Sequence, residues 1–338
     1  DGAVNFAADV TFVDGADIIT ASAGTSNFRA GVNAGNSIVS GGNYNTVVGD
    51  EAGTAITTGD DNTFVGYASG DANTTGSYNT SLGVQALSTN TTADSNTAVG
   101  RLALYLNTTG ANNVAVGANS LDANTTGAGN VAVGYAALDA NTTASDNTSV
   151  GADSLTANTT GASNVAVGKN AMYANTTGAS NVAIGYTALD ANTTASNNTA
   201  VGYASLGANT TGYSNVAVGM NALDANTTAN HNIAIGVSSL GTNTTGATNV
   251  AVGDSALFAN TTASNNTAVG HSALNANTTG GSNVAVGSLA LDACTTGGSN
   301  VAIGTSALSA STTAGLLTAI GASALAANTS GTANVAVG

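Results

Sequence analysis

Residues 45–49 read Asn-Thr-Val-Val-Gly, and the same pattern returns every 17 residues until residues 334–338, which read Asn-Val-Ala-Val-Gly. No insertion or deletion interrupts this spacing. A globular enzyme needs local departures for its loops and active site, whereas a chain that stacks identical coils along an axis must keep its register. The period therefore predicts a solenoid.

The first five positions of the repeat, numbered from its asparagine, predict a strand and a corner. Position 4 is always aliphatic, and position 2 is Val, Ile or Thr. Because positions 2 and 4 share one face of a strand, we expect a short strand with these side chains inward. Position 5 is Gly in every copy, which indicates a positive φ or a corner too crowded for a Cβ atom.

Positions 8 and 9 predict a second short strand. Position 8 is Ala or Ser, and position 9 is Leu or Met from Leu87 onward. Only about six residues separate the glycine from the next Asn-Thr-Thr, too few for a stable helix. We therefore expect a strand with the leucine inward. In the first two repeats position 9 is Gly53 and Gly70, and there we expect the core to taper.

Two columns of asparagine are candidates for structural ladders. Asparagine fills position 12 except at Ile56, Cys294 and Ser311, and position 1 except at Leu317. The Asn-Thr-Thr sequence suits a turn, and stacked asparagine amides stabilise cross-β assemblies. The expected ladders include Asn113, Asn130 and Asn164 at position 1, and Asn124, Asn141 and Asn158 at position 12.

The predicted fold is all-β, a parallel β-solenoid (β-roll) with 17-residue coils. Residues 45–338 form 17 complete repeats and a partial one, and residues 1–44 form an N-terminal cap or connector. Within that leader, residues 4–7 and 10–13 alternate like strands, and residues 27–31 look like a degraded first coil. At about 4.8 Å between stacked strands the rod is roughly 80 Å long. Residue 338 stops inside a new coil, so we expect the protein or the rod to continue.

The composition argues against several classes of partner. Charged residues are 6% of the chain, and the net charge is −15 with only three basic residues. Nucleic-acid binding needs cationic groups that displace phosphate counterions, and anionic membrane surfaces also attract basic segments. No apolar run approaches the ~18 residues of a membrane span. We therefore expect neither nucleic-acid binding nor membrane insertion in this segment.

The stretch Asn-Val-Ala-Val-Gly-Tyr-Ala-Ala at residues 130–137 resembles the head repeat of trimeric autotransporter adhesins. It is also similar to repeats of phage tail fibres and related bacterial fibre proteins. The resemblance covers residues 45–338 and implies a left-handed β-roll, three chains side by side, with a surface that binds host matrix or cells. The adhesin repeat is typically shorter, because the Asn-Thr-Thr-Gly turn lengthens the coil here, and this departure bears on the trimer and its binding surface.

No constellation of residues predicts catalysis, a cofactor or a metal site. His231 and His271 fall at different repeat positions, and neither has a partner cysteine at ligand spacing. The single cysteine, Cys294, replaces a ladder asparagine, which indicates a neutral substitution. A column of aspartates at position 10 is read as solvated charge, with a weak calcium column as the alternative; it contains Asp122, Asp139, Asp190, Asp224 and Asp292.

The repeated Asn-Thr-Thr is also a sequon for N-glycosylation. We favour turn chemistry as its reason. The alternative is a regular stripe of glycans on the position-12 column, which would include Asn124, Asn141, Asn158, Asn175 and Asn192.

Three hypotheses for function follow. The leading one is a structural component of an extracellular fibre on a cell or virion surface, a rigid rod without catalysis that assembles with itself as a homotrimer or end to end. The second is an adhesin whose own surface binds glycans or matrix, with Tyr135, Tyr186 and Tyr203 at position 6 as a sugar-stacking face. The third is ice binding by paired threonines such as Thr125 and Thr126.

Overall fold

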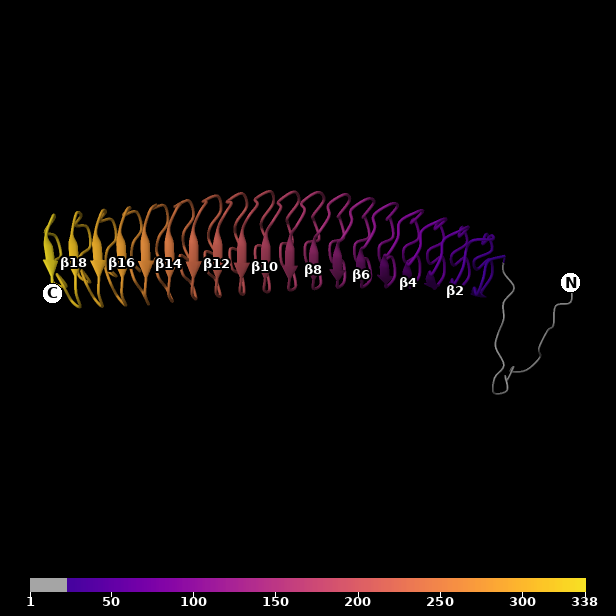
Figure 1. The fold of residues 1–338 in the computed structure, drawn as a ribbon. Helices are drawn as coiled ribbons and strands as arrows, with labels where there is room; N and C mark the ends of the chain where they lie inside the picture. Colours follow the sequence, from indigo (N-terminus) through magenta and orange to yellow (C-terminus); the bar gives the residue numbers. More distant parts are fainter. Residues whose placement is uncertain (1–22) are drawn as a thin grey trace, which may run out of the picture.

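The computed structural model describes residues 23–338, which form a long, gently curved rod of stacked coils (Figure 1). Each coil contributes one three-residue strand to a single parallel sheet, in which every strand pairs with the strands before and after it in the chain. The strands are β1 (Phe28–Ala30), β2 (Thr46–Val48), β3 (Thr63–Val65), β4 (Thr80–Leu82), β5 (Thr97–Val99), β6 (Val114–Val116), β7 (Val131–Val133), β8 (Thr148–Val150), β9 (Val165–Val167), β10 (Val182–Ile184), β11 (Thr199–Val201), β12 (Val216–Val218), β13 (Ile233–Ile235), β14 (Val250–Val252), β15 (Thr267–Val269), β16 (Val284–Val286), β17 (Val301–Ile303), β18 (Thr318–Ile320) and β19 (Val335–Val337).

The register of the sheet confirms the predicted fold class. Val114 of β6 lies opposite Val131 of β7, so each strand is displaced by one 17-residue repeat from the next. The same in-register pairing joins every neighbouring pair from β2 to β19. The described residues contain no helix. Identical positions therefore stack into columns along the rod, as a β-solenoid requires.

The expected orientation of the strand is wrong. In β6 the middle residue, Ala115, is fully buried, while Val114 and Val116 on either side are only half-buried. The same alternation recurs along the sheet, so position 3 faces the core and positions 2 and 4 face outward. The physical reason is the narrowness of the coil: a small side chain at position 3 leaves room for the leucine that enters from the other wall.

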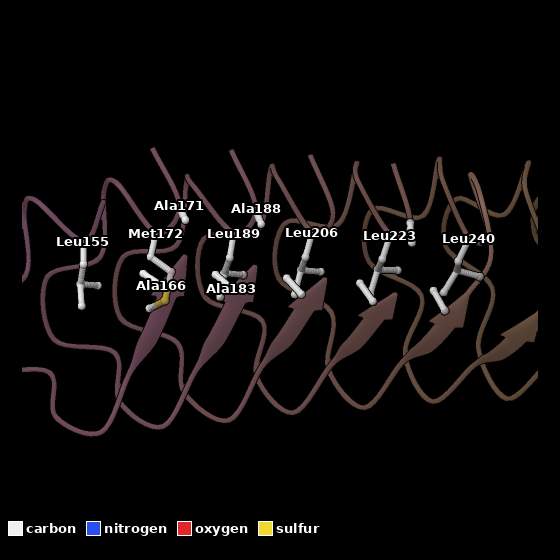
Figure 2. Close-up of a cluster of buried hydrophobic side chains, with 14 of the residues drawn as sticks. Leu155, Ala166, Ala171, Met172, Ala183, Ala188, Leu189, Leu206, Leu223 and Leu240 are labelled. Carbon is white, nitrogen blue, oxygen red and sulfur yellow. The ribbon is translucent and has the colours of Figure 1, made fainter. Parts of the chain in front are cut away.

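Leucines at position 9 form the apolar spine of the core. Leu138, Leu155 and Leu189 are fully buried, and Figure 2 shows this column running from Leu155 through Met172 to Leu240 with the position-3 alanines beside it. Each coil adds about one large apolar side chain to this thin core. A single coil is therefore unstable alone, and its stability comes from its two neighbours.

Positions 8 and 9 are not a second strand, which corrects the prediction. They belong to a turn in which positions 7 and 9 have positive φ, as at Asn119 (56°) and Leu121 (52°). A non-glycine residue in this region costs about 1–2 kcal/mol. The turn offsets that cost with hydrogen bonds to both neighbours: Asn119 N donates to Arg101 O of the preceding coil, and Leu121 N donates to Ala137 O of the following one.

The glycine at position 5 has both expected features, a positive φ and a corner too crowded for a Cβ atom. Gly134 has a φ of 144°, and a Cβ atom on it would lie 2.4 Å from the carbonyl oxygen of Gly151. The same glycine-to-glycine contact repeats along the rod. Successive coils therefore approach each other closely through their backbones at this corner.

The first two coils do not taper, contrary to expectation. Where position 9 lacks a side chain, position 3 is large: Phe64 and Val47 are fully buried there, together with Ile56. A Cβ atom on Gly70 would lie 2.6 Å from the Phe64 ring, so the ring occupies the space that leucine fills in later coils. A large side chain at position 3 therefore replaces the missing leucine at position 9, and the core keeps its width.

The coil that begins at Asn27 contains one extra residue. β1 pairs with β2 in a register of 18 residues, with Phe28 opposite Thr46. The amide of Asn27 donates to Gly42 O, as the position-1 asparagine does in regular coils. The extra residue, Gly41, lies in the turn and has a φ of 114°. The expected strands at residues 4–7 and 10–13 lie outside the described residues.

Candidate functional site

The functional features of this chain are columns of side chains along the rod. Within each coil the residues at positions 1, 3, 8, 9, 12 and 15 are buried in most repeats, whereas positions 6, 14 and 17 form the most exposed corners. A surface property of the rod must therefore come from these corners or from the half-buried positions between them.

The position-12 column forms an amide ladder inside the rod. Asn124 Nδ2 donates to Asn107 Oδ1 of the preceding coil at 2.8 Å and to Gly127 O of its own coil at 2.9 Å. Asn141 and Asn158 repeat both bonds in the next two coils. The ladder thus fixes the turn and joins neighbouring coils at once.

The position-1 column forms a second ladder with a different pattern. Asn130 N donates to Asn113 Oδ1 of the preceding coil at 2.9 Å, and Asn130 Nδ2 donates to Ala144 O at 2.9 Å. Asn164 makes the same two kinds of bond. Because the position-15 carbonyl accepts from both asparagines of its coil, the two ladders meet and close the coil.

The buried ladder bears on the glycosylation hypothesis. The side chains of Asn124, Asn141, Asn158, Asn175 and Asn192 are fully buried, and each Nδ2 already donates two hydrogen bonds. A glycan on that nitrogen would break both bonds and would have no room inside the rod. The geometry therefore argues against a glycan stripe on the folded coil and favours turn chemistry as the reason for the sequon.

The tyrosines at position 6 are exposed but do not make a continuous face for sugars. The rings of Tyr186 and Tyr203 stack on each other, with centroids 5.6 Å apart and planes 16° from parallel. Each ring therefore covers one face of the other. Tyr135 is 59% exposed and has alanines in its column on both sides, Ala118 and Ala152.

The two threonines of a coil have different roles. Thr125 Oγ1 donates to Thr142 O of the next coil at 2.9 Å, so the hydroxyl of position 13 is used within the rod. Thr126 is exposed, as is every residue at position 14. The structure therefore presents one column of exposed threonines, and the paired array on which the ice-binding hypothesis rests is reduced to that column.

The position-10 aspartates lie at the edge of the core. Burial raises the pKa of Asp122, and the carboxylate of Asp139 in the next coil raises it further against the opposing effect of Arg101. Burial alone raises the pKa of Asp139. Asp122 Oδ1 and Asp292 Oδ1 are buried without a hydrogen-bond partner. Within residues 23–338 no group of three or more His, Cys, Asp and Glu side chains could hold a metal ion.

The remaining residues singled out from the sequence are dispersed. His231 makes an edge-on contact with the ring of Tyr213, at a centroid distance of 5.1 Å, and His271 is exposed in another column. Cys294 is fully buried, and burial raises the pKa of its thiol. The structure does not bring these side chains together.

Sequence reasoning missed the outward face of the sheet. We use the name outer sheet face for the side chains at positions 2 and 4 of β2–β19. The missed signal was position 3, which is Ala or Ser from Ser81 onward, because a narrow coil has room for only a small side chain opposite the leucine.

No protein-family model matches the chain, and a comparison with curated proteins finds no significant match. Among the residues that the structure describes, none forms a helix long and apolar enough to cross a membrane. The geometry of the columns is therefore the basis for a function.

Proposed function

We propose that this chain is a rigid segment of an extracellular fibre, a rod that displays or attaches something else at a cell or virion surface and performs no catalysis. The observation that carries this proposal is the role of the most strongly recurring residues, the asparagines and the position-5 glycine. The repeat's asparagines point inward and bond coil to coil, and its position-5 glycines pack backbone to backbone.

The same observation explains why these residues recur. A site that acts on a ligand keeps a constellation of different polar groups that face outward. Here the exposed position 6 holds Tyr, Lys, Asp, Met and Ala in different coils, and the exposed polar group that recurs is the single hydroxyl of position 14. What the repeat chiefly preserves is the stacking of coils. This is the requirement of a long, rigid spacer, and assembly with further copies, side by side or end to end, belongs to the same proposal.

Electron microscopy of the purified chain tests the shape directly. We expect unbranched rods about 80 Å long, since 17 steps of about 4.8 Å separate β2 and β19. Labelling of the native source with an antibody against the repeats should then mark filaments outside the cell or on the virion. Globular particles, or label confined to the cell interior, would contradict the proposal.

A further inference from the structure

The outer sheet face is a long apolar strip that no other part of the described chain covers. It carries two side chains on each strand from β2 to β19, and none of them is charged. Several are substantially exposed, among them Ile184 and Ile235 at 40% each and Leu82 at 49%. All 17 charged residues of the described chain lie at other positions.

The strip is continuous as well as apolar. Each strand has three residues in strict register with its neighbours, and the inward residue at position 3 is fully buried from β2 to β18. The arrows in Figure 1 accordingly form one uninterrupted sheet along the rod. Two columns of side chains, β-branched except at Leu82, stand on this sheet, about 7 Å apart within a strand and about 4.8 Å apart between strands.

The size of the strip exceeds what a solitary soluble protein exposes. A length of roughly 80 Å and a width of roughly 10 Å give about 800 Å², whereas the largest apolar patch of a typical monomer is about 300–600 Å². A standard protein–protein interface buries about 800 Å² on each partner. One face of this rod therefore supplies the area that a stable dimer needs.

We propose that a second copy of this chain packs its own outer sheet face against this one, so that rods associate side by side through positions 2 and 4. The proposal rests on the fibre function and names its lateral partner. An occupant must be uncharged and apolar over the same length and must repeat at the same spacing. A second copy meets all three conditions, and its rows of side chains can interdigitate as in packed β-sheets.

Three lysines on the strip test the proposal in the full chain. Val116→Lys, Val150→Lys and Ile184→Lys place a cation on alternate strands at position 4. The matched control, Thr126→Lys, Thr160→Lys and Thr194→Lys, places the same charges at position 14 of the same three coils. Sedimentation equilibrium reports the state of association, and circular dichroism verifies that each variant is folded.

We expect the wild type and the control to associate and the strip variant to dissociate at least about tenfold more readily, because charges would be buried unpaired in an apolar interface. If the strip variant does not fold, Val114→Thr, Val131→Thr and Val165→Thr replace it, since threonine already occupies position 2 in eight coils. These threonines should weaken the association in the same direction and by less.

Other outcomes overturn the proposal. If the wild type stays monomeric at the highest attainable concentration, a second copy does not pack on the strip. Thermal hysteresis in the same sample would then identify ice as the ligand of the strip. Equal association of all variants would place the contact on another surface. Rods seen by microscopy in a monomeric sample would leave the fibre function intact while removing the lateral partner.

Discussion

At the residue scale, the position-12 ladder has one gap whose cause is visible. Cys294 replaces the asparagine that would donate to Asn277 Oδ1, and this oxygen is buried without a partner. In the next coil the Ser311 hydroxyl is also unpartnered, and Asn328 beyond it bonds only within its own turn. A buried acceptor without a donor costs about 1–3 kcal/mol.

The first prediction closes this gap with two substitutions. Cys294→Asn alone gives Asn277 a donor but leaves its own Oδ1 opposite Ser311, so the unpaired acceptor only moves by one coil. Ser311→Asn alone leaves Asn277 unpaired. Together they join Asn277 to Asn328 in one ladder, and we expect a stabilising coupling of about 1 kcal/mol.

A double-mutant cycle on the denaturant midpoint measures this coupling. Cys294→Ser is the control, because a hydroxyl at this position does not reach the amide column, as Ser311 already illustrates. Additive effects of the two asparagines would show that the ladder bonds do not stabilise the rod.

The orientation of the strand shows where sequence reasoning at single residues succeeded and failed. The strand and its register followed from the period, but the general preference of β-branched residues for a core placed Val114 and Val116 inside. The informative residue was Ala115, because position 3 is Ala or Ser in nearly all coils. In a coil this narrow, the wall that faces a leucine must carry a small side chain.

At the scale of the element, the turn of positions 7–9 could not be inferred from its leucine. A fully buried leucine with a φ of 52°, as at Leu121, contradicts ordinary strand and helix propensities alike. Position 17, by contrast, gave a usable signal: most of its residues are Asn, Asp, Ser or His. Asparagine, aspartate and histidine are enriched at positive φ, and this position has it throughout, as at Asn112 (60°).

The second prediction concerns positions 3 and 9 of one coil, whose side chains fill the same space in the core. Phe64→Ala should leave a cavity and cost about 3–5 kcal/mol. Gly70→Leu alone should also destabilise, because its Cβ would lie 2.6 Å from the Phe64 ring. The double variant recreates the Ala and Leu pair of later coils, so we expect it to be more stable than either single variant.

Unfolding of the four proteins in denaturant forms the cycle for this prediction. The rescue should be partial, because Phe64 also packs beside Gly53 of the preceding coil. Val47→Ala, which leaves the Phe64 ring in place, should not be rescued by Gly70→Leu. If the destabilisation of the double variant equals the sum of the two single effects, positions 3 and 9 do not share one space.

The third prediction follows from the carboxylates at position 10. Burial, followed by the neighbouring carboxylate of Asp139, raises the pKa of Asp122 above its ordinary value of 3.8. A carboxyl whose pKa is higher in the folded state holds its proton more tightly there. Its destabilising effect is therefore absent below the ordinary value and grows as the pH rises through the raised pKa.

Asp122→Asn and Asp139→Asn should consequently stabilise the rod at neutral pH and have much less effect in acid. The measurement is the difference in unfolding midpoint between wild type and variant across that pH range, which cancels contributions from other groups. Asp146→Asn, at the exposed position 17, is the control. A variant that stabilises equally at all pH values would assign the effect to packing.

At the scale of the whole molecule, stability is a sum over identical neighbours. Each coil bonds only to the coils before and after it, so the rod has no long-range tertiary contact that depends on its total length. Such an array is close to one-dimensional, and its folding depends on the register at each junction. The number of coils can then change freely as long as whole coils are added or removed.

The last prediction tests this property by removing three coils. Deletion of residues 147–197 joins Asp146 to Asn198, so that β7 pairs with β11 and Asn198 takes its place above Asn130. We expect a folded rod shortened by about 14 Å, with an unfolding midpoint close to that of the full chain. X-ray scattering measures the length, and circular dichroism verifies the fold.

The control deletion removes residues 148–197 and leaves one extra residue before position 1. The one 18-residue coil of the structure places its extra residue, Gly41, in a turn with positive φ, whereas Asn147 would here precede the strand and displace its side chains. A displaced strand exposes its core residue and buries its outward ones, so hydrogen exchange should accelerate at this junction and remain slow in the 51-residue deletion. Equal protection in both deletions would mean that the 17-residue register is not what holds the coils together.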